Sequence, residues 1–222
     1  NASYDRYWEG RKLLGMMVNR CTDIMRQVHA YVADECERAH LHELVRAWTL
    51  ATMRTLRGER ALGPVSEHLT PAERDALGGT EQWPLVIASW ITARLRAQAD
   101  EGRLEETRLR SMDVNLTAMT DALGGCERIR KTPIPFAYAQ HIKLFVVLFC
   151  FTAPFAMSEA MGWYTPRVAG ILAFALFGID EIGVEIEDPF GSDANDLPLD
   201  AIEATIARGL EDLASARTAQ ES

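Results

Sequence analysis

Several signals that mark large classes of protein are missing from this 222-residue sequence. Lys and Arg number 23 against 32 Asp and Glu, which gives a net charge of −9 and no dense basic surface for nucleic acid. The 4 cysteines are far apart and form no Cys-x-x-Cys pair, so we expect neither a zinc site nor a disulfide framework. Alternating runs bounded by hairpin turns and glycine-rich phosphate loops are also missing. These absences favour an all-α protein that does not bind nucleic acid.

The first part of the chain has the period of amphipathic helices. Within residues 3–57, apolar side chains recur at steps of three and four, which predicts one long helix or two. The residues that carry this pattern are Leu13, Met16, Met17, Cys21, Ile24, Met25, Val28 and Val32. Gly58 interrupts it.

Start and stop signals mark the helices that follow. Thr70 and Glu73 have the spacing of a capping box, which predicts a short helix. Pro84 is expected to begin another helix. A third covers about residues 104–123 and is expected to end at Gly124 and its glycine neighbour.

Two apolar segments come next. Residues 133–157 contain two side chains that can carry charge, His141 and Lys143. A helix of this length spans about 37 Å, enough to cross a bilayer. A second apolar segment covers residues 160–179, and an aromatic pair typical of a membrane interface, Trp163 and Tyr164, lies near its start. Neither segment has roughly 18 uninterrupted apolar residues, so buried helices of a soluble bundle fit the same pattern.

These features divide the chain into three parts. Residues 1–132 are expected to form a mainly cytosolic helical bundle, whose start continues a membrane helix that lies upstream. Residues 133–183 are expected to form two transmembrane helices. Residues 184–222 are expected to form a cytosolic acidic loop and an amphipathic helix with Asp200 as its N-cap. Basic residues before the first apolar segment place its start on the cytoplasmic side.

The strongest chemical signal is the acidic loop "EIEDPFGSDANDLPLD". Hard cations need several oxygens that converge from a bent backbone, and Gly191 permits such a bend. The other interpretation is a loop of solvated acids and helix caps. The stretch "HLHELVR" lacks the second histidine of a zinc protease motif, because Arg46 stands there.

Three stretches resemble the bacterial bestrophin-type channels: "NASYDRYWEGRK", "LGGCERIRKTPIPFAY" and "IEDPFGSDANDLPLD". They follow the order of the family and span nearly the whole chain. The resemblance implies an all-α membrane protein, in which long helices form a transmembrane part and a cytosolic helical bundle around a central pore. It also implies a homopentamer in the bacterial inner membrane, with the acidic loop and the C-terminus cytoplasmic. By the same resemblance, the sequence begins after the helix that carries the narrow neck of the pore.

The resemblance further implies candidate site residues. A cytosolic constriction of the pore is expected at Leu109, one apolar side chain per subunit. The acids that match a calcium-binding loop of animal relatives are Glu185, Asp188, Asp193 and Asp196. No cofactor is expected to be required, and calcium is the divalent cation that these acids would bind.

The sequence thus predicts a passive channel for small monovalent ions and no enzymatic activity. A net charge of −9 on each subunit favours cations over chloride in the vestibule. The alternative is a soluble all-α enzyme in which the acids hold Mg²⁺ against a phosphorylated substrate.

Overall fold

The computed structural model describes residues 2–193 and 195–221, except for the side chains of residues 218–221. No β-strand is found in these two ranges, so the predicted all-α fold is confirmed. The helices are α1 (Ala2–Tyr31), α2 (Glu35–Arg57), η1 (Gly63–His68), α3 (Pro71–Gly78), α4 (Trp83–Asp100), α5 (Glu106–Lys131), α6 (Phe136–Met161), η2 (Gly162–Tyr164), α7 (Thr165–Glu185) and α8 (Leu199–Glu221).

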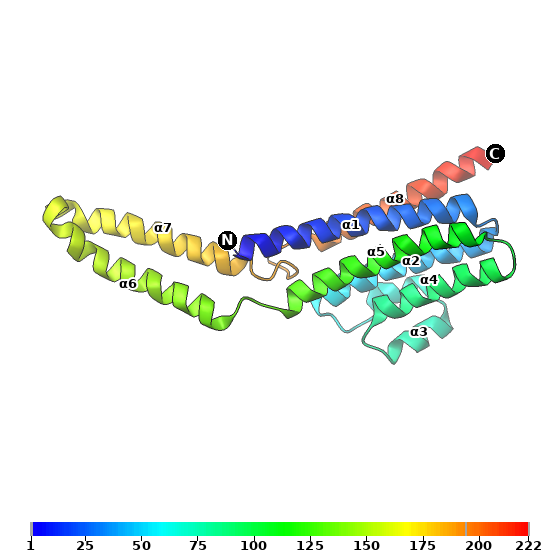
Figure 1. Cartoon of the computed structure of the whole chain (residues 1–222), viewed down its shortest axis with the longest axis horizontal. Coiled ribbons are helices and arrows are strands. Elements are labelled where there is room, and N and C mark those ends of the chain that lie inside the picture. Colours follow the sequence, from blue (N-terminus) through cyan, green and yellow to red (C-terminus); the bar gives the residue numbers. More distant parts are fainter. Residues whose placement is uncertain (1, 194, 222) are drawn as a thin grey trace.

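The molecule is long and has two parts (Figure 1). Five helices, α1, α2, α4, α5 and α8, run lengthwise in a bundle, with α3 on its flank. The pair α6 and α7 extends from one end of the bundle as a helical hairpin. The N-terminus lies at the junction of the two parts, beside the end of α7, and the C-terminus lies at the opposite end of the bundle.

The apolar residues that recur at steps of three and four along α1 form part of the core of the bundle, as predicted. Its buried apolar residues are Leu14, Met17, Cys21, Ile24, Met25 and Val28, which pack toward α5 and α8. Met16 was expected in the same stripe but is 39% exposed, because it lies on the opposite side of the helix from Leu14. Burial raises the pKa of the Cys21 thiol to about 12, so this cysteine is an inert core residue.

Local capping explains where the helices of the first half begin and end. Of the two alternatives for residues 3–57, one helix or two, the structure has two, because the side chain of Asp34 accepts a hydrogen bond from the N–H of Glu37 and starts α2. Gly58 ends α2 in the left-handed region, with φ of 76°. The capping box of Thr70 and Glu73 is present at the start of α3.

Two predicted boundaries are wrong. The glycine pair does not end α5, which continues to Lys131. Gly125 instead allows close packing, since a Cβ there would come within 2.8 Å of Leu13 Cδ1. Asp200 is not an N-cap, because α8 already begins at Leu199, and its carboxylate receives two hydrogen bonds from Arg57.

The hairpin has the surface of a membrane protein. Residues Phe136–Glu185 form a run of 50 helical residues that turns back on itself at η2. The run is long and apolar enough to cross a membrane, and its most apolar window is not buried at all. Trp163, in η2 between α6 and α7, is 86% exposed. Such a large exposed apolar surface is rare in soluble monomers, so the alternative of buried core helices does not fit.

Candidate functional site

One arginine of α1 joins the bundle to the hairpin. The guanidinium of Arg6 donates to the carbonyl oxygens of Ile129 (2.6 Å), Thr132 and Glu187 (3.3 Å). The carboxylate of Glu187 in turn accepts a hydrogen bond of 3.1 Å from the N–H of Ile134. The end of α5, the start of the hairpin and the loop after α7 therefore meet at one side chain of α1.

The acidic loop is fixed to α1 by apolar contacts. Phe190 is 1% exposed and Leu197 is 2% exposed, and both lie against Gly10. The N–H of Leu197 donates to the carbonyl oxygen of Pro189 at 2.9 Å, which closes the loop on itself. The loop is therefore a folded element of the junction.

Of the four predicted calcium ligands, Glu185 is the last residue of α7 and the other three lie in the loop. Local hydrogen bonds engage one oxygen each of Glu185, Asp188 and Asp196, whereas Asp196 Oδ1 is buried without a partner. Asp196 Oδ2 accepts from the N–H of Asp193 at 2.7 Å, and Asp188 Oδ1 accepts from the N–H two residues later at 3.3 Å. Glu185 Oε1 accepts from the side-chain amide of Asn195 at 2.8 Å. These contacts match the interpretation of the acids as loop-stabilising groups.

The four acids are nevertheless close enough to affect one another. Partial burial raises the pKa of Asp196, and the negative charges of Asp193, Asp188 and Glu185 raise it further, against the hydrogen bond from the Asp193 N–H. Among residues 2–193 and 195–221, no group of three or more His, Cys, Asp or Glu has a geometry that could hold a metal ion. Calcium binding by the loop stays a prediction.

A cavity of about 340 Å³ lies where α1, α6 and α7 meet. Lys143 of α6 and Asp180 of α7 both line it, together with Tyr138 and the buried Ser3. The predicted intramembrane charge at Lys143 therefore has an opposite charge on the neighbouring helix. His141, the other ionisable group of the segment, is exposed on the surface of the hairpin.

The predicted constriction residue Leu109 lies in α5. It is 8% exposed and belongs to the hydrophobic core of the bundle. Burial within one chain favours a packing role for Leu109, and a pore constriction at this residue stays a prediction. Its sequence neighbours Arg108 and Arg110 are exposed, because they lie on the outer side of α5.

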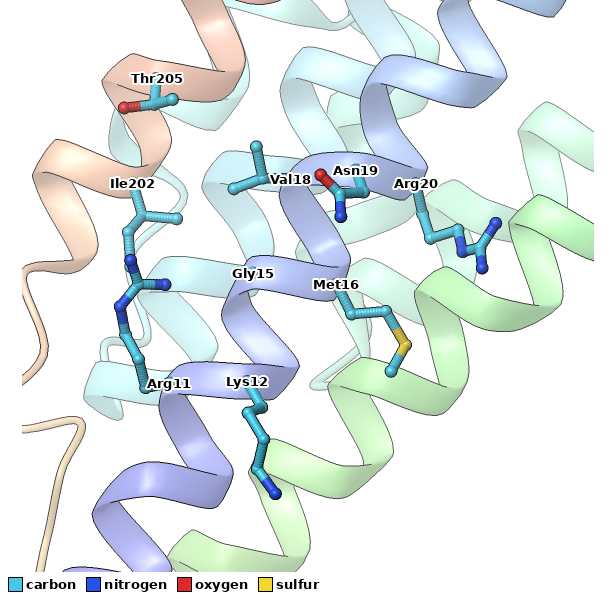
Figure 2. Close-up of a pocket in the computed structure, with 9 residues that line it drawn as sticks. All are labelled: Arg11, Lys12, Gly15, Met16, Val18, Asn19, Arg20, Ile202 and Thr205. Carbon is cyan, nitrogen blue, oxygen red and sulfur yellow. The ribbon is translucent and has the colours of Figure 1, made fainter.

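A basic groove on the outer face of α1 was missed by sequence reasoning. Figure 2 shows Arg11 extended toward Ile202 of α8, and Lys12 and Arg20 on the other side of α1, toward α5. The sequence contained a signal for this groove, namely a cluster of basic residues within three turns of one predicted helix. Arg6 could not be assigned in the same way, since its partners are 123 to 181 residues away.

A carboxylate between two histidines connects α2 to η1. Glu43 accepts from His68 Nδ1 at 2.5 Å and contacts His42 Nδ1 at 3.4 Å. Partial burial raises the pKa of Glu43, but the hydrogen bonds and charges of His68 and His42 outweigh it and lower the pKa below its ordinary value. Arg46 forms an ion pair with Glu211 of α8, so "HLHELVR" is a packing surface.

An elongated helical bundle with an apolar, unburied helical hairpin defines a helical membrane protein. The family model described as "Bacterial/Fungal Bestrophin protein" matches residues 1–212, and the chain belongs to this family. A "voltage-dependent anion channel-forming protein" of Synechocystis is 43% identical over 219 residues, which cover 96% of this chain and 71% of the relative. A protein of the same description from Nostoc is 40% identical, with 97% and 72% covered.

The solved structures agree. A crystal structure of a bacterial bestrophin homologue from Klebsiella pneumoniae superposes with a TM-score of 0.91 at 28% sequence identity, covering 96% of this chain and 80% of the homologue. The predicted resemblance is therefore confirmed. The family and these relatives are ion channels and not enzymes, so the alternative of a Mg²⁺-dependent enzyme is not supported.

Proposed function

We propose that this chain is the subunit of a homopentameric channel that passes small monovalent ions across the bacterial inner membrane. The observation that carries the proposal is the family match over residues 1–212, which includes both the hairpin and the bundle. The geometry supports an oligomer, because the apolar window of the hairpin is unburied in one chain. An ion path needs polar walls, which the apolar hairpin of one chain does not supply, so the proposal places the path between copies.

The proposed orientation follows from charge. Two crossings by α6 and α7 return the chain to the side from which it started. Arg128, Arg130 and Lys131 lie in the last turn of α5, directly before the hairpin. Basic residues favour the cytoplasmic side, so the bundle, the acidic loop and the C-terminus are cytoplasmic in this proposal.

We favour anions as the permeant ions, because relatives at 43% and 40% identity are described as anion channel-forming proteins. Cations remain the second candidate, because each chain carries a net charge of −9 and five copies would produce a negative potential. The choice between anions and cations depends on the charge of the surfaces that line the ion path. Exposed charges more than about 10 Å from a permeant ion are largely screened at 0.1 M salt.

Molecular mass tests the oligomer. The protein is purified in detergent and its protein mass is measured by light scattering with correction for bound detergent. We expect five times the chain mass of 24.8 kDa. A monodisperse species of one chain mass that elutes without detergent would contradict the proposal.

A further inference from the structure

The groove on the outer face of α1, called here the α1 groove, has a basic lining in a chain that is acidic as a whole. It has a volume of about 540 Å³ and is lined by Arg11, Lys12, Gly15, Met16, Val18, Asn19, Arg20, Ile202 and Thr205. Three of these nine residues are basic and none is acidic, in a chain whose net charge is −9. The side-chain amide of Asn19 can donate hydrogen bonds to an anion, whereas the hydroxyl of Thr205 already donates to the carbonyl oxygen of Ala201 at 2.7 Å.

The positive charge of the groove is only partly neutralised. Lys12 contacts Glu9 at 3.1 Å, and Arg20 contacts Asp23 at 3.5 Å. The pair of Lys12 is exposed and screens its cation incompletely, whereas Arg20 is half-buried and also donates a hydrogen bond of 3.0 Å to Asn115 Oδ1 of α5. Arg11 makes no ion pair with any residue that the structure describes, and Figure 2 shows its guanidinium below Ile202, inside the groove.

The groove lies close to the membrane end of the bundle. α1 begins at the junction with the hairpin and runs along the bundle (Figure 1). Arg11 is nine residues after Ala2, about 14 Å along the helix. Tyr4 and Trp8 precede it on the exposed face of α1, at 56% and 53% exposure. The exposed aromatic residues of α1 therefore lie between the junction with the hairpin and the basic residues.

We propose that the α1 groove is an anion-binding site that concentrates small anions at the cytoplasmic entrance of the channel, with Arg11 as its main determinant. The inference rests on the proposed function. Each subunit carries a net charge of −9, and this negative charge would repel the permeant anions of an anion channel. A local basic surface at the entrance would reverse the electrostatic potential there. The α1 groove supplies such a surface.

The first test measures selectivity. Wild-type protein and the double variant Arg11→Glu/Lys12→Glu are reconstituted in planar bilayers under a KCl gradient. We expect the chloride-to-potassium permeability ratio of the variant to fall at least about threefold, since a reversed local potential changes ion concentration by factors of this order or more. Arg74→Glu makes the same type of change at an exposed residue on α3 and should leave the ratio unchanged.

The second test does not require conduction. Trp8 lies one turn before Arg11 and Lys12, so iodide held by the groove quenches its fluorescence. Trp90→Phe/Trp163→Phe serves as the background, because Trp48 and Trp83 are buried. In low salt, the iodide quenching constant should fall at least about twofold in the double variant. Quenching by neutral acrylamide should stay the same. The difference should disappear near 1 M salt, where the screening length is about 3 Å.

The two tests separate the inference from the proposed function. A wild-type protein that forms no current contradicts the proposed function, and the iodide experiment then decides the inference alone. Unchanged iodide quenching in the double variant would overturn the anion site. So would a permeability ratio that changes equally in the Arg74→Glu control.

Discussion

Phe190 lies against the backbone of Gly10: a Cβ at Gly10 would come within 3.1 Å of Phe190 Cζ. The two residues are 180 positions apart, and their contact attaches the loop after the hairpin to the first helix of the bundle. Because Arg6 holds the end of α5 and the same loop one turn earlier, α1 connects the two parts of the molecule. A movement of the hairpin relative to the bundle would have to change these contacts.

Gly10→Val should detach the loop. Its branched side chain cannot share the space with Phe190, and overpacking of this kind costs typically about 1–3 kcal/mol. We expect a lower free energy of unfolding and faster hydrogen exchange in the segment between α7 and α8. Gly124→Val is the matched control, because nothing lies within 4 Å of a Cβ at Gly124. Equal effects of the two variants would contradict a specific role for the Gly10 contact.

Leu109→Ala should act on stability and not on permeation. Leu109 is 8% exposed in the core, so its truncation should cost about 2–5 kcal/mol. The control Val114→Ala changes a residue of the same helix that is 66% exposed and should cost much less. Denaturant unfolding measures both variants. A Leu109→Ala protein of wild-type stability but altered conductance would contradict this expectation and support the predicted constriction.

Glu43→Gln should lower stability at neutral pH and not at acidic pH. The pKa of Glu43 is lower in the folded protein than its ordinary value of about 4.3, so ionised Glu43 stabilises the fold above that pH. The stabilisation is lost as the pH falls through the lower folded pKa. The carboxylate is 44% exposed, so solvent limits the effect to about 0.5–1 kcal/mol. Unfolding curves at pH 7 and pH 3.5 measure the difference.

The control for this experiment is Glu81→Gln, at an exposed carboxylate whose nearest cation, in Arg60, is 3.5 Å away. We expect no resolvable change at either pH. A destabilisation of Glu43→Gln that is the same at pH 7 and pH 3.5 would show that ionisation of the carboxylate is not the cause.

Calcium should leave the melting temperature unchanged at millimolar concentration. One oxygen each of Glu185, Asp188 and Asp196 already accepts a local hydrogen bond, and the described residues form no metal-binding group. Thermal unfolding in calcium, magnesium and EDTA measures this. A calcium-specific rise that Asp193→Asn removes would contradict the expectation and establish the predicted site by mass action.

Sequence reasoning succeeded where the signals are local. The period that buries Met17 and Val28 and the capping box of Thr70 depend on neighbours within a few residues, so they can be read from one chain. Sequence reasoning failed where contacts between residues far apart in the sequence determine the local structure. Gly125 looks like a helix stop but accommodates Leu13.

The same limit applies to the candidate site. The acidic loop was predicted from composition, but its attachment to Gly10 was not, because no local pattern reports a contact over 180 residues. Leu109 was assigned by counting along a helix, and a shift of one position moves a side chain by about 100° to another face. Family resemblance gave the class of protein, since three separated stretches carry it together.

The reversal potential of the reconstituted wild-type protein tests the central claim most directly. Pentamer-sized protein in a planar bilayer, with a tenfold KCl gradient, should give currents that reverse close to the equilibrium potential of chloride. Reversal close to the equilibrium potential of potassium would contradict anion selectivity and support the cation alternative. The absence of any protein-dependent current from correctly assembled pentamers would contradict the account of this chain as a channel subunit.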